Sequence, residues 1–206
     1  MRHTPAHFSP LARLLHWSMA LMIIAMLFIG AGMVASVSER HAWLLDLHRP
    51  LGIAILLLAI VRVIVRVSSR TPALPSDLPA WQKLAATLSH YLLYALMLAM
   101  PLIGWGLVSA AGDPVMLTSS LRLPALMSAD AATFAFLRQA HTYLAYLLFL
   151  TVVTHLAAAL FHAWIRRDEV MSSMARGEEG VSGVERWAQW GANRRAPLRR
   201  SPFAWG

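Results

Sequence analysis

The sequence predicts an all-α membrane protein, a bundle of four transmembrane helices with both termini in the cytoplasm. Hydrophobic residues make up 58% of the 206 residues and charged residues only 14%, a balance that soluble domains of this size do not have. A hydrocarbon core of about 30 Å takes roughly 20 helical residues to cross. Four apolar stretches are long enough, namely Leu14–Val37, Leu51–Val67, Tyr91–Ala111 and Leu144–Ile165.

The first stretch follows Ser9 and Pro10, a pair typical of a helix start because proline is tolerated in the first turn. It is longer than the apolar region of a signal peptide, and three more stretches follow it, so we expect a retained helix. The second stretch is the weakest. Arg62 and Arg66 lie near its inner end, where both can extend their charged groups to the lipid headgroups.

Three connections separate the stretches. We expect a short first outer loop from Ser38 to Leu47 and an extended inner connector over Ser68–Pro79, which is rich in proline and serine. The second outer loop, from Gly112 to about Phe136, is the longest. It contains the turn signal Gly112-Asp113-Pro114 and can cover a site at the outer end of the bundle or receive a partner there.

Basic residues predict the topology. With the amino terminus inside, fourteen of the 18 lysine and arginine residues fall on the inner side: Arg2, Arg13, Arg62, Arg66, Arg70, Lys83 and the eight arginines from Arg166 onward. Only four fall outside, namely Arg40, Arg49, Arg122 and Arg138. This is a strong positive-inside bias. The net charge of +8 is therefore explained by topology and by attraction to anionic lipid headgroups, and nucleic-acid binding is not expected.

The polar carboxyl-terminal region predicts a division of the chain. We expect a transmembrane domain over residues 1–170 and a basic cytoplasmic tail over 171–206 that lies on the membrane surface or is disordered. The tail contains no repeat and no catalytic motif, and catalytic residues are not assigned anywhere in the chain. Anchoring by positive charge explains the tail better than docking of a partner does.

Two histidines on the fourth stretch are the most informative side chains. His141 and His155 are fourteen residues apart, which on an α-helix leaves them about 40° apart in azimuth and roughly 21 Å apart along the axis. They share a face but cannot share a metal ion. Histidine in a membrane span indicates a functional site, although a hydrogen bond to a neighbouring helix is the alternative use.

Depth in the membrane pairs these histidines with two others. His48 lies at the outer start of the second span and matches His141, and His16 lies near the inner end of the first span and matches His155. Two neutral imidazoles can fill both axial positions of a haem iron, which suits electron transfer. Zinc or copper needs three or four converging ligands, so a mononuclear metal site is the weaker alternative. Without cysteine no thioether attachment exists, so we expect two non-covalent haem b groups.

The surroundings fit this interpretation. Arg49 adjoins His48, Arg138 precedes His141 by three residues and Arg13 precedes His16 by three, so these arginines can pair with haem propionates or anchor the helices at the interface. Gly52 follows His48 by one turn and would let a porphyrin approach the backbone. The same close approach is possible at four more glycines, although ordinary helix packing is the more common use of such residues: Gly30, Gly32, Gly104 and Gly106.

Two further histidines leave the inner pair open. His162 follows His155 by seven residues on nearly the same face and can replace it as the partner of His16. His90 lies beside Tyr91 on the inner side of the third span, where it suits a hydrogen bond near the inner haem or part of a quinone pocket better than a ligand.

These residues lie in stretches that resemble the bacterial cytochrome b561 family, which comprises four-helix, dihaem inner-membrane proteins related in fold to the cytochrome subunits of nickel–iron hydrogenases. The matching stretches are LARLLHWSMA around His16, LHRPLGIAILLLAIVRVIVR around His48, LSHYLLYALMLAMPLIGW around His90, and RQAHTYLAYLLFLTVVTHLAAALFH, which spans His141 and His155. They cover most of residues 10–170.

The resemblance implies axial ligands at His16, His48, His141 and His155, a location in the bacterial inner membrane, and one-electron transfer between haem and membrane quinone. One branch of the family oxidises superoxide at the outer side and reduces ubiquinone. The tail after Met174 has no counterpart in the pattern.

Three functions follow from these observations. The first is a dihaem cytochrome exchanging electrons with ubiquinone, in its specific form a superoxide:ubiquinone oxidoreductase; whether the chain is itself an enzyme stays open at this stage. The second is a haem-bearing membrane anchor that relays electrons for a dehydrogenase or hydrogenase partner. The third is a haem-free transporter that uses membrane histidines, which the lack of acidic residues in the third and fourth spans disfavours.

Overall fold

Four long helices form the body of the protein. The computed structural model describes residues 8–69, 78–117 and 120–175. Within these ranges four helices are long and apolar enough to cross a membrane: α1 (Pro10–Val34), α2 (Glu39–Ser68), α3 (Ala80–Ala110) and α4 (Ala131–Phe161), the last continued by the π-helical segment η1 (His162–Arg166). The predicted four-helix membrane architecture is confirmed.

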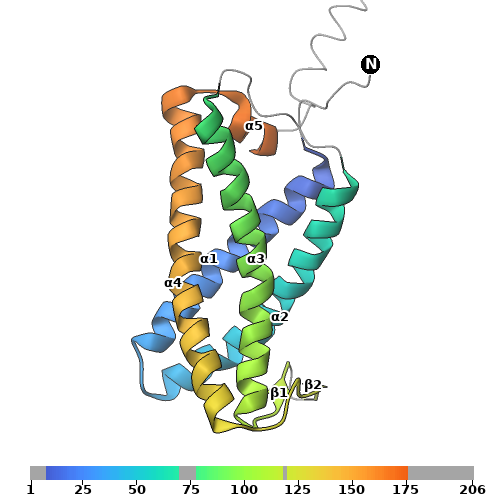
Figure 1. Ribbon diagram of the computed structural model, residues 1–206, viewed down its shortest axis with the longest axis vertical. Coiled ribbons are helices and arrows are strands. Elements are labelled where there is room, and N and C mark those ends of the chain that lie inside the picture. The colour runs from blue at the N-terminus through green and yellow to red at the C-terminus, as the bar shows by residue number, and fades with distance from the viewer. Residues whose placement is uncertain (1–7, 70–77, 118–119, 176–206) are drawn as a thin grey trace, which may run out of the picture.

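The helices pack as two pairs. Helices α3 and α4 lie side by side along the long axis, and α1 and α2 form a second pair that crosses them at an angle (Figure 1). Helix α2 packs against α3, whereas the backbones of α1 and α4 make no extended contact. The start of α1 and the short helix α5 (Glu169–Ala175) lie at one end, which we call the inner end because the basic residues assign it to the cytoplasm.

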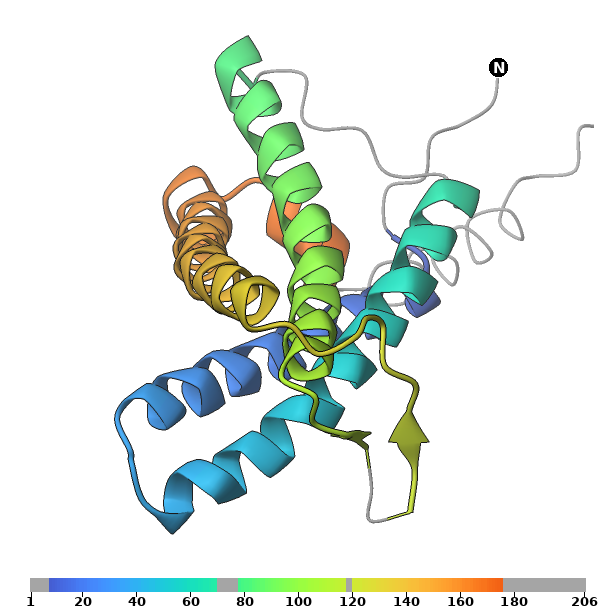
Figure 2. The same cartoon turned by 60° about the horizontal axis from the view of Figure 1, so that its bottom comes forward.

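A short hairpin closes part of the outer end. Strands β1 (Val115–Met116) and β2 (Arg122–Leu123) pair antiparallel between α3 and α4. Figure 2 shows them on one side of the outer end, with the loop between α1 and α2 on the other. Val115 is buried, and β1 contacts α2 and α3. The all-α prediction did not include this hairpin, because two-residue strands leave no periodicity to detect.

Local sequence explains where the helices begin and end. The Ser9 side chain accepts a hydrogen bond from the Ala12 amide (3.3 Å), and Pro10 opens α1 as predicted. Asp130 caps α4 by accepting from the Thr133 amide at 2.7 Å. The turn predicted at Gly112 is confirmed, since Gly112 has a φ of 81° and the amide of Asp113 reaches back to the Val108 carbonyl.

The helices extend beyond the apolar stretches. The first outer loop was predicted over Ser38–Leu47, but α2 already begins at Glu39, so that prediction is wrong. Likewise α3 begins at Ala80 and α4 at Ala131, well before their apolar segments. Hydropathy marks only the part of a helix in hydrocarbon, and good helix formers carry it on into the interface. The inner connector lies mostly outside the described residues, as do residues 176–206 of the predicted tail.

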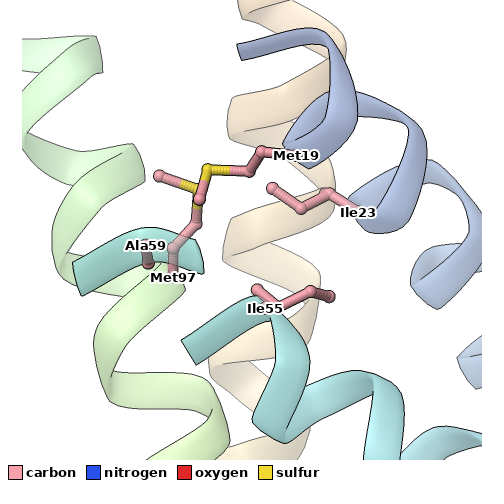
Figure 3. Packing of buried hydrophobic residues seen from close by; sticks show 5 residues of the cluster. All are labelled: Met19, Ile23, Ile55, Ala59 and Met97. Carbon is pink, nitrogen blue, oxygen red and sulfur yellow. The ribbon is translucent and has the colours of Figure 1, made fainter. Parts of the chain in front are cut away.

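A small apolar cluster forms the centre of the bundle (Figure 3). Its fully enclosed members come from three helices: Met19, Ile23, Ile55, Ala59 and Met97. Ala59 is 0% exposed, so α2 is in close contact with its neighbours at that point. Most other large apolar side chains are exposed on the outer faces of the helices, as expected where lipid replaces water.

The chain folds back at the inner end. Arg167 has a left-handed backbone conformation (φ 53°, ψ 37°), which ends η1 and turns the chain toward α5. The Ser173 carbonyl then accepts a hydrogen bond from the Phe8 amide (3.2 Å), and the Met174 carbonyl accepts one from Trp17 Nε1 (3.3 Å). The folded region therefore reaches Ala175, a few residues into the segment expected to be tail.

Candidate haem-binding sites

The outer end of the bundle brings His48 and His141 together. Their ring centroids are 6.1 Å apart and their planes are inclined at 64°. Both Nδ1 atoms are buried, and neither has a hydrogen-bond partner in the described part of the chain. Buried polar atoms without partners are rare in folded proteins.

The inner end brings His16 and His155 together in the same way. Their ring centroids are 6.4 Å apart and their planes are inclined at 62°. His90 from α3 lies beside this pair, with its centroid 5.4 Å from that of His155. The inner site therefore has three imidazoles from three helices, whereas the outer site has two from two helices.

These spacings suit a metal ion held between two imidazoles. Imidazole nitrogen binds transition metals at about 2 Å, which puts the centroids of two rings on opposite sides of one ion about 6 Å apart. The observed 6.1 and 6.4 Å match this value. The backbones of α1 and α4 make no extended contact, as the insertion of a flat macrocycle between His16 and His155 would require. The residues present therefore fit bis-histidine haem at both levels.

The central apolar cluster separates the two histidine pairs. Ile55 is seven residues inward from His48 on α2, and Met19 is three residues outward from His16 on α1. At 1.5 Å per residue these offsets place the cluster between the two depths. The two sites are therefore distinct centres with apolar side chains between them.

The arginines expected near the haems have different surroundings. Arg13 and Arg49 are partly buried, and each has a buried Nε without a hydrogen-bond partner among the described residues. They remain available to an acceptor that the described residues do not supply, such as a propionate. Arg138 is exposed on α4, a position that suits the outer surface better than a buried contact.

Gly52 and Gly104 differ in what a side chain at their position would contact. A Cβ at Gly52 would meet only Met26 Cε, at 3.7 Å, so this position packs against α1 in the described structure. A Cβ at Gly104 would come within 3.3 Å of His141 Cε1. The sequence left Gly104 open between close approach of a porphyrin and ordinary packing, because only the tertiary structure shows that α3 presents this position to the histidine of α4.

Arg62 has a role that the sequence did not indicate. The sequence predicted that its charge would lie among the lipid headgroups, but the guanidinium turns into the bundle. There Nη2 lies 3.0 Å from His16 Nδ1, and Nη1 donates to the Ala12 carbonyl at 3.1 Å. The guanidinium also lies 5.9 Å from the centre of the Tyr94 ring. Arg66, one turn further along α2, remains exposed as expected.

His162 lies in a separate cluster at the inner end. Its Nδ1 is 2.6 Å from Asp168 Oδ2, and Arg166 Nε is 3.2 Å from the same oxygen. The structure thus places His155, and not His162, against His16. The π-helical turn changes the direction of the His162 side chain relative to α4, and π-helical turns are common at functional sites.

Comparison with known proteins identifies the family of the chain. The family model described as prokaryotic cytochrome b561 matches residues 7–177. The chain belongs to the prokaryotic cytochrome b561 family. It is therefore a multi-pass inner-membrane protein of bacterial electron transport that binds b-type haem, as the sequence predicted.

Individual relatives cover nearly the whole family domain. Cytochrome b561 homolog 2 of Escherichia coli (strain K12) is 30% identical over 88% of this chain and 98% of its own length, and homolog 1 is 26% identical over 81% and 96%. A protein of Yersinia pestis named probable superoxide oxidase CybB is 28% identical over 81% of this chain and 94% of its own length.

Proposed function

We propose that this member of the cytochrome b561 family holds two haem b groups, His48 with His141 and His16 with His155, and carries electrons across the membrane to the quinone pool. The observation that carries the proposal is the presence of two histidine pairs, both near the spacing of axial ligands, at two depths of one bundle. Haem iron supplies one-electron chemistry, and the chain sets the ligation, the burial and the separation.

The protein groups around each pair have separate tasks. Arg49 at the outer site and Arg13 at the inner site provide guanidinium N–H donors for propionates, since both have an unpartnered buried Nε. Gly104 lets the backbone of α3 approach the His141 ring closely, and Gly52 lets α2 pack against Met26 of α1 one turn from His48. The apolar cluster around Ala59 excludes water between the two levels.

The favoured overall reaction is the oxidation of superoxide at the outer side with reduction of ubiquinone. Two superoxide anions each lose one electron and leave as dioxygen, while one ubiquinone gains two electrons and two protons and becomes ubiquinol. The exposed Arg138 and Arg122 give the outer surface positive charge that attracts an anion. The relative named probable superoxide oxidase supports this choice of substrate.

Proton delivery to quinone needs a titratable group at the inner side. The His162–Asp168 pair fits this role, since a carboxylate fixes one ring nitrogen and leaves the other to exchange protons. His90 lies closer to the inner histidines and serves as a neighbour of His155 that can orient its ring.

Spectra and substrate assays test the proposal. Purified protein should show low-spin b-type bands on reduction and contain about two haems per chain by pyridine haemochrome assay. With a superoxide source and a short-chain ubiquinone it should form quinol, and superoxide dismutase should abolish the reaction. One haem per chain would contradict the dihaem assignment. Two haems without quinol formation, together with stable co-purification of a redox enzyme, would favour the membrane-anchor function.

A further inference from the structure

Arg62 connects three helices at the inner histidine site. From α2 it donates to the Ala12 carbonyl of α1, approaches His16 Nδ1 at 3.0 Å and lies over the Tyr94 ring of α3. A cation–π contact and two hydrogen bonds hold the guanidinium at the histidine pair, away from the membrane surface. Arg62 lies near the inner end of α2, from which its charged group could reach the lipid headgroups. Its inward orientation therefore calls for an explanation.

The contact with Arg62 disfavours one of the two tautomers of neutral His16. A guanidinium has only donors, so His16 Nδ1 must accept from Arg62, and the ring proton of neutral His16 must lie on Nε2. An imidazole that binds iron through Nε2 carries its proton on Nδ1 instead, where it would face the Arg62 N–H group. Arg62 therefore disfavours the ligating tautomer and places a positive charge next to it.

The outer pair has no equivalent contact. The Nδ1 atoms of His48 and His141 have no hydrogen-bond partner in the described ranges, so no arginine donates to either ring there. The two sites thus have the same imidazole spacing but a different charge in contact with a ligand. Ferric haem carries one more positive charge than ferrous haem, and a cation nearby favours the ferrous form.

We infer that Arg62 is a positioning residue whose positive charge beside His16 makes the inner haem easier to reduce than the outer one. The inference rests on the dihaem function proposed above. It gives electron flow a direction, because an inner centre that is easier to reduce draws electrons from the outer side toward the side where quinone is reduced. It also means that the inner haem is bound less tightly than it would be beside a neutral acceptor.

Arg62→Gln tests the inference with a side chain that can accept the Nδ1 proton of His16. Spectroscopic redox titration of the purified holoprotein should then show the inner haem harder to reduce. At a fixed potential its oxidised-to-reduced ratio should rise about tenfold, which is 59 mV for one electron. The titration of the outer haem and the haem content should stay the same.

Arg66→Gln is the matched control. It removes the same charge one turn away, from an exposed residue that contacts the Phe8 ring (5.5 Å) and makes no hydrogen bond or ring contact with His16 or His155 among the described residues. It should leave both haem titrations within about twofold of wild type, because exposed charges are screened.

Three results would overturn the role of Arg62. The first is an inner haem that titrates in Arg62→Gln as in wild type, and the second is an equal shift in Arg66→Gln. The third is loss of the inner haem in Arg62→Gln, which would assign Arg62 to a propionate. Wild-type protein without an inner haem would overturn the dihaem function as well, so the two failures are distinguishable.

Discussion

Gly104 of α3 lies directly against the imidazole of His141 on α4. A Cβ at position 104 would come within 3.3 Å of His141 Cε1 and 3.7 Å of its Nδ1. The glycine thus fixes how closely α3 can approach a candidate axial ligand and limits the orientations of its ring. Gly106, two residues along the same helix, has the same clearance but faces Leu137 and Met127.

Gly104→Ala should therefore weaken the outer haem site selectively. The added methyl group must displace the His141 ring, and overpacking of this kind costs about 1–3 kcal/mol. We expect reduced outer haem content and altered low-spin electron paramagnetic resonance signals, with the inner haem unchanged. Gly106→Ala is the control, since its methyl group meets the flexible ends of Leu137 and Met127 at 3.3 Å. Equal effects of the two variants would show that helix packing alone is responsible.

Alanine substitution of the four paired histidines should remove the haems in two groups. His48→Ala and His141→Ala should each lose the outer haem, and His16→Ala and His155→Ala the inner one, because each iron would lose an axial ligand. Haemochrome assays and difference spectra measure the loss. His41→Ala is the control, since its Nδ1 already lies 3.0 Å from the Met33 carbonyl and belongs to neither pair. Loss of the inner haem in His162→Ala with its retention in His155→Ala would refute the inner pairing.

Asp168→Asn should slow quinone reduction without loss of haem. The substitution removes the carboxylate that is 2.6 Å from His162 Nδ1, so the imidazole is less well oriented for proton transfer. We expect quinol formation to fall about tenfold or more, in line with general acid–base effects. Asp113→Asn, at the outer end, should leave the rate unchanged. A full rate in Asp168→Asn would exclude this pair from proton delivery.

The cap of α4 should make stability depend on pH in acid. The hydrogen bond from Thr133 lowers the pKa of Asp130 below its ordinary value of 3.8. A carboxyl group with a lowered pKa stabilises the folded protein at any pH above the pKa that it has in the unfolded chain. This contribution is lost as the pH falls through the pKa of the group in the folded protein. Asp130→Ala should therefore lower the melting temperature at pH 7, and the difference from wild type should shrink below pH 3.8. Asp130→Asn should keep most of the stability at pH 7, because asparagine caps equally well.

The sequence predicted the membrane class, the number of spans and the residues to examine because these depend on local properties. Apolar length reports the crossing of hydrocarbon, and Ser9 and Gly112 mark helix ends through local backbone geometry and bonds to residues only a few positions away. Helix extension into the interface was missed at Glu39 because hydropathy does not report it.

Depth along a helix follows from the sequence, since each residue adds about 1.5 Å, and it was enough to match His48 with His141. It left His155 and His162 both open as partners of His16. The tertiary structure distinguishes them, because η1 changes the helical turn and the left-handed Arg167 brings Asp168 back to His162. Only the packing of α2 against α1 and α3 decides that Arg62 turns toward His16 instead of the headgroups. The direction in which a side chain leaves its helix becomes meaningful only once the neighbouring helices are in place.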